Sequence, residues 1–116
     1  HTVAMYSNED TFSLFRTKAD EAYLIGENKS PLGAYLDIPR IIELAKKHGA
    51  DAIHPEYRTL AVPGAVEGCK RANVRIHPWT VNAEADMRAL CGIPCEAIIT
   101  NHPDIARRVV DETQKA

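Results

Sequence analysis

The sequence has few cysteines, and this scarcity excludes a class of small stapled proteins. Its 116 residues include three cysteines, Cys69, Cys91 and Cys95. A small, odd number of cysteines is not typical of a secreted disulfide framework, so we expect reduced thiols. Three residues separate Cys91 from Cys95, unlike the two-residue gap of a zinc knuckle, and no second pair completes four ligands. We therefore expect no zinc site there.

An excess of charge of one sign is also missing. The 14 Lys and Arg residues nearly balance the 16 Asp and Glu residues, which leaves a formal net charge of −2. Such a balance argues against nucleic acid or an anionic membrane as partner. No apolar run approaches the roughly 18 residues of a transmembrane helix. Residues 1–10 also lack the basic and apolar regions of a signal peptide, so we expect a cytoplasmic, recombinant protein.

The common catalytic motifs are absent as well. The sequence contains no GxGxxG, GxxxxGK[ST], HExxH or GxSxG. Phosphate cradling by a glycine-rich loop and the common zinc or nucleophile arrangements therefore have no support. The residues therefore support no catalytic residue, and, with the family resemblances given below, we also expect no cofactor and no native small-molecule substrate.

Short apolar runs alternate with amphipathic stretches along nearly the whole chain. This alternation is typical of parallel strands joined by crossover helices, and the length suits a single domain. The predicted strands are residues 2–6, 21–25, 51–54, 74–81 and 97–100.

One helix has clear signals at both ends. Asp37 and Pro39 mark its start, an apolar stripe begins at Ile38, and Gly49 stops it. We predict further helices over residues 62–73, after Asn82 as a cap, and after a cap at Asn101 or His102. Residues 26–35 contain Gly, Asn, Ser and Pro, and we expect a flexible loop there.

The first half of the chain carries long sequence blocks that resemble a known family. The blocks KADEAYLIG, SPLGAYLDI and HGADAIHP within residues 2–55 resemble the N-terminal subdomain of biotin carboxylases of the pyruvate carboxylase type. Two departures from that pattern are Phe15, where the family usually has His, and His54 to Arg58, which replace an HPGYG turn. An aromatic residue at a formerly polar position suggests a surface that has become core.

The second half resembles a different family. The blocks HPEYRTL, ANVRIHPWTVN, ADMRAL and AIITNHPD, over about residues 53–110, resemble the C-terminal part of a glycerophosphodiester phosphodiesterase, a TIM-barrel enzyme. The two resemblances overlap at residues 51–57. Because one strand-helix unit can replace another of the same geometry, we interpret the chain as an engineered or recombined chimera, a de novo protein with segments 1–55 and 56–116.

This interpretation leads to a fold. Loss of the carboxylase's own first strand would bring the first and third strands of this chain together. We then expect a single three-layer α/β domain over residues 1–116, with a five-stranded parallel sheet in the flavodoxin-like or Rossmann-like order 2-1-3-4-5. The alternative is a curved half-barrel, a TIM-barrel fragment that dimerises. Exposed sheet edges make a homodimer plausible in either case.

The resemblances also imply that both active sites are incomplete. Biotin carboxylases handle ATP, bicarbonate and biotin chiefly in their other subdomains. The phosphodiesterases carry a catalytic His-Arg-Gly segment and metal-binding carboxylates largely on early barrel strands. We therefore expect a folding or design protein without catalytic activity, not an enzyme. The alternatives are weak residual phosphate-ester or divalent-metal binding, or vestigial phosphodiesterase activity, at the carboxyl ends of the strands.

Open parallel sheets bind ligands at those strand ends. The candidate ligand-binding residues there are Trp79, Asn101 and His102, and His54 with Glu56 could share a divalent metal. Each has a structural alternative: His54 as a loop residue, Asn101 as a helix cap and Trp79 as a cover over the end of the core.

Overall fold

The computed structural model describes residues 1–115, which fold as two compact units, residues 1–50 and residues 51–115. Each unit pairs two short parallel strands and packs helices on an apolar cluster of its own. Within residues 1–115 no helix combines the length and apolar character needed to span a membrane.

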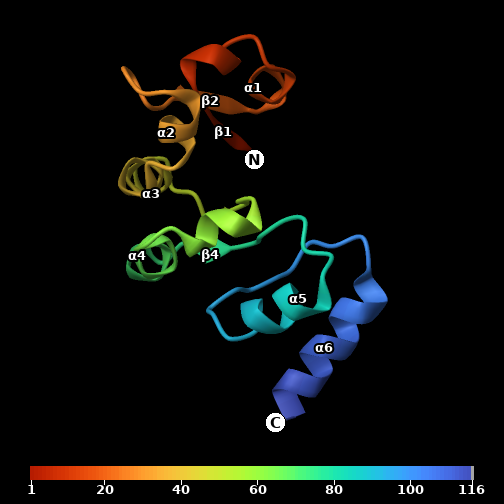
Figure 1. Cartoon of the computed structure of the whole chain (residues 1–116). Helices are drawn as coiled ribbons and strands as arrows, with labels where there is room; N and C mark the ends of the chain where they lie inside the picture. Colours follow the sequence, from red (N-terminus) through yellow and green to blue (C-terminus); the bar gives the residue numbers. More distant parts are fainter. Residues whose placement is uncertain (116) are drawn as a thin grey trace. The chain divides into compact units, whose positions relative to one another are not determined.

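The first unit is built on a parallel strand pair. Strands β1 (Val3–Tyr6) and β2 (Glu21–Leu24) align so that Val3 faces Glu21 and Tyr6 faces Leu24. The connection between them holds the short helix η1 (Asn8–Asp10) and α1 (Leu14–Lys18), and α1 contacts both strands (Figure 1). The prediction that these two apolar runs form neighbouring strands is confirmed.

Two helices close the core of the first unit. Helices α2 (Pro31–Tyr35) and α3 (Ile38–Lys47) contribute Ala34 and Leu44, which are buried together with Ile25. Helix α3 begins after Asp37, whose carboxylate accepts a hydrogen bond from the Arg40 N–H. It stops before Gly49, whose φ of 67° is the left-handed conformation that glycine adopts without strain. The helix predicted from these signals is confirmed.

Helix α2 lies where we predicted a flexible loop. Ser30 caps it by accepting the Gly33 N–H at 3.1 Å, and Pro31 occupies its first turn. Gly26 has a φ of 66°, and a Cβ there would collide with the side chain of Ala34. The turn residues of this segment therefore start a helix and allow a close approach to it.

A hydrogen-bond network joins the end of β1 to α2. The Tyr35 hydroxyl donates to the Asp10 carboxylate at 2.5 Å and accepts the Ser7 N–H at 3.0 Å. Ser13 donates to the other oxygen of Asp10 at 2.8 Å. Ser7 is 1% exposed, so its N–H depends on this partner. The hydrogen bonds from Tyr35 and then Ser13 lower the pKa of Asp10.

The connection after β1 leaves large apolar side chains in solvent. Phe12 is 94% exposed, Leu14 71% and Phe15 46%. Our expectation that Phe15 joins a core is wrong. Helix α1 has only five residues, and none of them is buried.

In the second unit, strands β3 (Ala52–Ile53) and β4 (Arg75–Ile76) pair in parallel. Their hydrogen-bond ladder continues beyond the strand ends, since the Trp79 N–H donates to the Pro55 carbonyl and the Tyr57 N–H donates to the Trp79 carbonyl. Between the strands lie η2 (Tyr57–Ala61) and α4 (Ala65–Ala72). Helix α4 is shorter than the predicted 62–73 and ends at Asn73, which is left-handed.

The predicted five-stranded sheet is not shown. The described residues form two separate two-stranded sheets, β1 with β2 and β3 with β4. Of the predicted strand 74–81 only Arg75–Ile76 is regular strand, and Pro78, which has no N–H, offers only its carbonyl to residues 97–100. Residues 97–100 form no strand, although the Ile99 N–H donates to the Pro78 carbonyl and the Val81 N–H to the Ile99 carbonyl. The half-barrel dimer stays an untested alternative.

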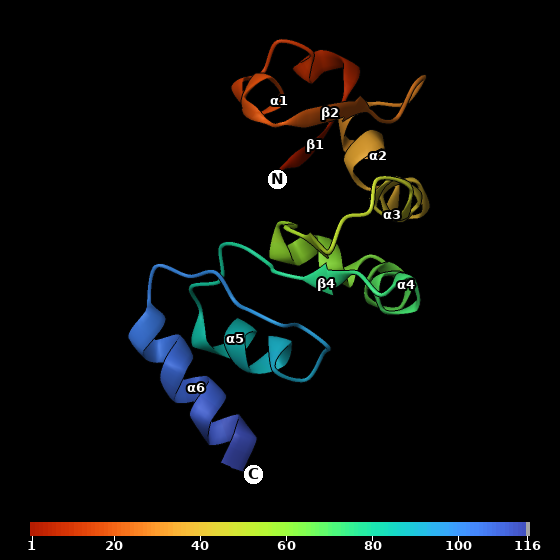
Figure 2. The ribbon, with the colours of Figure 1, turned by 180° about the vertical axis from the view of Figure 1, so that it is seen from behind.

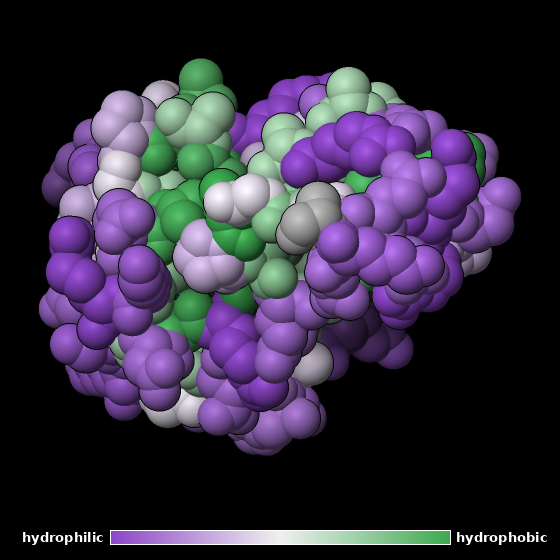
Figure 3. All heavy atoms as spheres, turned by 90° about the horizontal axis from the view of Figure 1, so that it is seen from below, coloured by the Kyte–Doolittle hydropathy of each residue, from purple (hydrophilic) through white to green (hydrophobic). Residues whose placement is uncertain are grey.

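Helices α5 (Glu84–Leu90) and α6 (Pro103–Lys115) lie side by side, as Figures 1 and 2 both show. Met87 and Leu90 of α5, Val109 of α6 and Val81 form the buried cluster between them. Around this cluster α6 is largely polar, and Figure 3 shows hydrophilic residues over most of the face it draws, with apolar residues between them.

Ion pairs tie α5 to α6 at the surface. The Glu84 carboxylate accepts from Arg88 at 2.6 Å and from Arg108 at 2.8 Å, and Arg88 also contacts Glu112. The hydrogen bonds from Arg88 and then the charge of Arg108 lower the pKa of Glu84. Glu84 is therefore the acidic centre of the contact between the two helices.

We expect Tyr35→Phe to lower the free energy of unfolding by about 1–3 kcal/mol, because it leaves the buried Ser7 N–H without an acceptor. Urea denaturation monitored by circular dichroism measures this change. Tyr6→Phe is the control, since the Tyr6 ring lies under the Arg16 guanidinium and keeps that contact without its hydroxyl. Equal stability of the two variants would contradict the structural role of the Tyr35 hydroxyl.

We expect Glu84→Gln to weaken the pH dependence of stability. Because the pKa of Glu84 is lower in the folded chain than its usual 4.5, its contribution is present above pH 4.5 and is lost as the pH falls below that value. Urea midpoints between pH 7 and pH 3 should therefore fall less steeply in the variant. Glu67→Gln in α4 is the control, since Glu67 forms no ion pair within residues 1–115. The same pH profile in all three proteins would refute the assignment.

Candidate functional site

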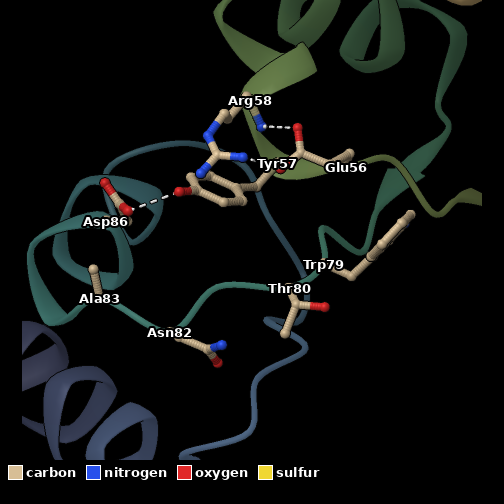
Figure 4. A pocket seen from close by; sticks show the side chains of 8 residues that line it. All are labelled: Glu56, Tyr57, Arg58, Trp79, Thr80, Asn82, Ala83 and Asp86. Atoms are coloured by element: carbon tan, nitrogen blue, oxygen red, sulfur yellow. Dashed lines mark hydrogen bonds and ion pairs between the residues drawn. The ribbon is translucent and has the colours of Figure 1, made fainter.

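The second unit contains a cavity of about 470 Å³ beside the end of its strand ladder (Figure 4). It is open to solvent, and its lining comes from the start of η2, the segment after β4 and the start of α5. The lining residues are Glu56, Tyr57, Arg58, Trp79, Thr80, Asn82, Ala83 and Asp86.

Tyr57 connects three parts of this lining. Its backbone N–H donates to the Trp79 carbonyl at 2.8 Å, which continues the parallel ladder. Its hydroxyl donates to the Asp86 carboxylate at 3.0 Å, and this hydrogen bond raises the pKa of Tyr57. Tyr57 therefore fixes α5 next to the strand ends.

Glu56 and Arg58 form a short local pair. The Glu56 carboxylate caps η2 by accepting the Arg58 backbone N–H at 3.1 Å, and it meets the Arg58 guanidinium at 3.4 Å. The guanidinium lies over the Tyr57 ring, 5.0 Å from its centroid. The Arg58 side chain is 76% exposed, so it faces solvent at the rim of the cavity.

Trp79, a predicted ligand-binding residue, lines the cavity and also contacts His54 within the fold. Its indole N–H donates to the His54 carbonyl at 3.0 Å, and its ring meets the His54 ring edge-on at 5.7 Å. Trp79 is 41% exposed. It therefore offers an apolar surface at the cavity while its polar atom is already bonded.

The other two predicted ligand-binding residues do not line the cavity. The Asn101 N–H donates to the Asn82 side-chain oxygen at 3.0 Å, and the His102 N–H donates to the Thr100 hydroxyl at 3.0 Å. Asn82 was predicted to cap a helix, but the residue before α5 is Ala83, and Asn82 binds the segment before α6 instead. Whether any of these residues binds a ligand is untested.

His54 and Glu56 also have partners within the fold. The His54 ring contacts Trp79, and the Glu56 carboxylate is engaged by Arg58. Residues 1–115 contain no group of three or more His, Cys, Asp and Glu side chains that could hold a metal. The proposed two-residue metal site thus stays an untested prediction. Cys69, Cys91 and Cys95 are free thiols in the structure.

Sequence reasoning missed Tyr57, Arg58 and Asp86. Tyr57 and Arg58 directly follow Glu56, so their position after a predicted strand was a signal that could have found them. Asp86 lies 29 residues further along the chain and reaches the cavity only through the packing of α5.

Comparisons with known proteins show similarity to the N-terminal domain of biotin carboxylases. The model of the family "Biotin carboxylase, N-terminal domain" matches residues 1–77. The chain is similar to pyruvate carboxylase of Bacillus subtilis, with 60% identity over 60 residues, which is 52% of this chain and 5% of that protein. It also resembles the solved pyruvate carboxylase of Rhizobium etli, with 40% identity and a TM-score of 0.57 over 64% of this chain and 7% of that chain.

The resemblance to phosphodiesterases is much weaker. A putative glycerophosphoryl diester phosphodiesterase from Silicibacter pomeroyi matches 95% of this chain and 30% of its own, with a TM-score of 0.57. The identity is 16%, so this likeness shows the fold alone. It adds no support for a phosphodiesterase function.

Our interpretation of the chain as an engineered chimera or de novo protein is wrong. The family match extends to residue 77, well beyond the expected junction at residues 51–57, and natural pyruvate carboxylases match 60 residues of this chain in Bacillus subtilis and 75 in rat. We also expected a folding or design protein, with residual or vestigial phosphodiesterase functions as alternatives. The family match contradicts this expectation as well. The chain spans about one twentieth of the length of the Bacillus relative. With its small parallel sheets and its match over residues 1–77, the chain belongs to the family of biotin carboxylase N-terminal domains.

Proposed function

We propose that the chain serves as a structural part of a biotin carboxylase unit in a protein of the pyruvate carboxylase type, and that it is not a catalyst by itself. The observation that carries this proposal is the 60% identity to a pyruvate carboxylase over 60 residues. The carboxylation of biotin would then be an activity of the larger protein.

The polar groups of the first unit support a structural role. Asp10 is occupied by Tyr35, Ser13 and Ser7, and Asp37 pairs with Lys29 at 2.5 Å. These carboxylates hold elements together and have partners already, so they are poorly placed to act as acids or bases on a substrate.

The exposed apolar residues of the first unit support membership of a larger protein. Phe12, Leu14 and Phe15 fall within four consecutive positions and are all exposed. Isolated domains rarely leave several large apolar side chains together in water, and such groups commonly mark contact surfaces. Neighbouring parts of a carboxylase would cover them.

A segment exchange tests membership of the carboxylase. We expect pyruvate carboxylase of Bacillus subtilis to keep most of its pyruvate carboxylation rate when its matching segment is replaced by the corresponding residues of this chain. The identity of 60% over that segment is the reason, because it favours the same strand pairing and core. An exchange that also carries Ile25→Asp is the control, since Ile25 is 1% exposed and a charge there disrupts the core. A soluble, folded but inactive exchange protein would refute the proposed role.

Assay of the chain alone tests the second part of the proposal. We expect no bicarbonate-dependent hydrolysis of ATP above background when free biotin is supplied. The reason is that the carboxylates of Asp10 and Asp37 already have partners within the fold. A phosphate-release assay measures this rate, with an intact biotin carboxylase as the positive control. Turnover by the purified chain that is lost in Asp10→Asn would overturn a purely structural role.

A further inference from the structure

We propose that the cavity of the second unit binds a small zwitterion of the free α-amino acid class. Arg58 would bind the ligand's carboxylate, Asp86 its ammonium group, and Trp79 would contact its side chain. This inference stands on the second unit alone and does not depend on the proposed carboxylase role.

The cation at the cavity retains hydrogen-bonding capacity. A guanidinium has five N–H donors, and the one contact that Arg58 makes with the Glu56 side chain is 3.4 Å long. Charge-assisted hydrogen bonds are usually about 2.7–2.9 Å, so this contact is weak and its geometry leaves the guanidinium fork open. A ligand carboxylate can take two parallel hydrogen bonds from it.

The anion at the cavity also retains capacity. The Asp86 carboxylate accepts one hydrogen bond, from the Tyr57 hydroxyl at 3.0 Å, whereas an ionised carboxylate has about four acceptor positions. Figure 4 shows the guanidinium above the Tyr57 ring and the Asp86 carboxylate beyond the hydroxyl of the same ring. One aromatic residue thus holds the positive and the negative group at a single cavity.

The mixture of charges selects the ligand class. A simple anion would meet Arg58 but also the carboxylates of Asp86 and Glu56, and a simple cation would meet the guanidinium. A ligand with both charges at neighbouring atoms satisfies each group and adds no net charge. Binding of such a ligand by paired opposite charges is favoured when the polar groups converge on one cavity.

The size and the wall of the cavity allow a large side chain. Its volume of about 470 Å³ falls within the range of pockets that hold small molecules. Trp79 is half-exposed at this wall, and its indole N–H is already bonded to His54, so it presents an aromatic surface. Stacking or edge contact with an aromatic ligand side chain would add to binding.

The test uses L-phenylalanine and two analogues that each lack one charge. N-acetyl-L-phenylalanine has no ammonium group, and L-phenylalaninamide has no carboxylate. We expect L-phenylalanine to bind with a Kd at least about tenfold lower than either analogue, because each analogue loses one charge-assisted contact. Equilibrium dialysis with radiolabelled ligand gives the Kd, and the fluorescence of Trp79, the only tryptophan, reports whether the ligand is at this cavity.

Two variants assign the charges. Arg58→Gln should raise the Kd of L-phenylalanine about tenfold and leave that of L-phenylalaninamide unchanged, since the amide makes no carboxylate contact. Asp86→Asn keeps an acceptor for Tyr57 and should weaken L-phenylalanine while leaving N-acetyl-L-phenylalanine unchanged. Arg107→Gln is the matched control, because Arg107 pairs with Asp111 on α6 and does not line the cavity.

Three results would overturn the proposal. They are no saturable binding of L-phenylalanine in dialysis, equal affinity for an analogue with one charge, and equal weakening by Arg58→Gln and Arg107→Gln. Circular dichroism of each variant separates loss of binding from loss of fold, and Arg58→Lys, which keeps the charge without the planar fork, gives a second measure if Arg58→Gln unfolds.

Discussion

The second unit depends on a parallel hydrogen-bond ladder that continues through two prolines. Proline cannot donate to a ladder, but its carbonyl can accept, and both prolines do so here. The Trp79 N–H donates to the Pro55 carbonyl, and the Ile99 N–H donates to the Pro78 carbonyl. The β3–β4 ladder therefore extends from residue 51 to residue 57, although the regular strands have two residues each, and the Pro78 carbonyl pairs with the segment between α5 and α6. Without it, Tyr57 and Trp79 would not line one cavity.

In the first unit the ends of the strand pair are held differently. Its strands are four residues long and pair without interruption, so the strand ends need less support from irregular segments. Side chains supply this support: the Tyr35 hydroxyl accepts the buried N–H of Ser7 just after β1 and donates to the Asp10 carboxylate. A parallel pair has no tight turn between its strands, so the crossover must be anchored to the sheet by contacts of its own. In the first unit these contacts are hydrogen bonds among Ser7, Asp10 and Tyr35. In the second unit they involve Tyr57 and Asp86, whose carboxylate has further acceptor positions at the cavity.

The parts of this fold that the sequence predicted are those with local signals. Helix α3 has a capping Asp37 and a stopping Gly49, and both act within a few residues. The prediction of a strand over residues 74–81 was too long, because an apolar run does not reveal whether a partner exists for each backbone N–H and carbonyl. Helix α2 was missed because Ser30 and Pro31 are equally typical of turns and of helix starts. Trp79 could be predicted at the cavity from its strand, whereas Asp86 arrives by the packing of a helix 29 residues from Tyr57.

The incorrect interpretation of the chain as a chimera also has a physical origin. A short parallel strand, a proline-containing loop and a crossover helix occur in many α/β proteins, since only a few geometries connect parallel strands. A phosphodiesterase with 16% identity accordingly matches this chain with the same TM-score as a pyruvate carboxylase with 40% identity. Similarity of this strand-loop-helix unit thus follows from strand geometry, and it carries no information on the chemistry of the protein. What distinguishes the families is the identity of the residues themselves, and over residues 1–77 that identity follows the carboxylases.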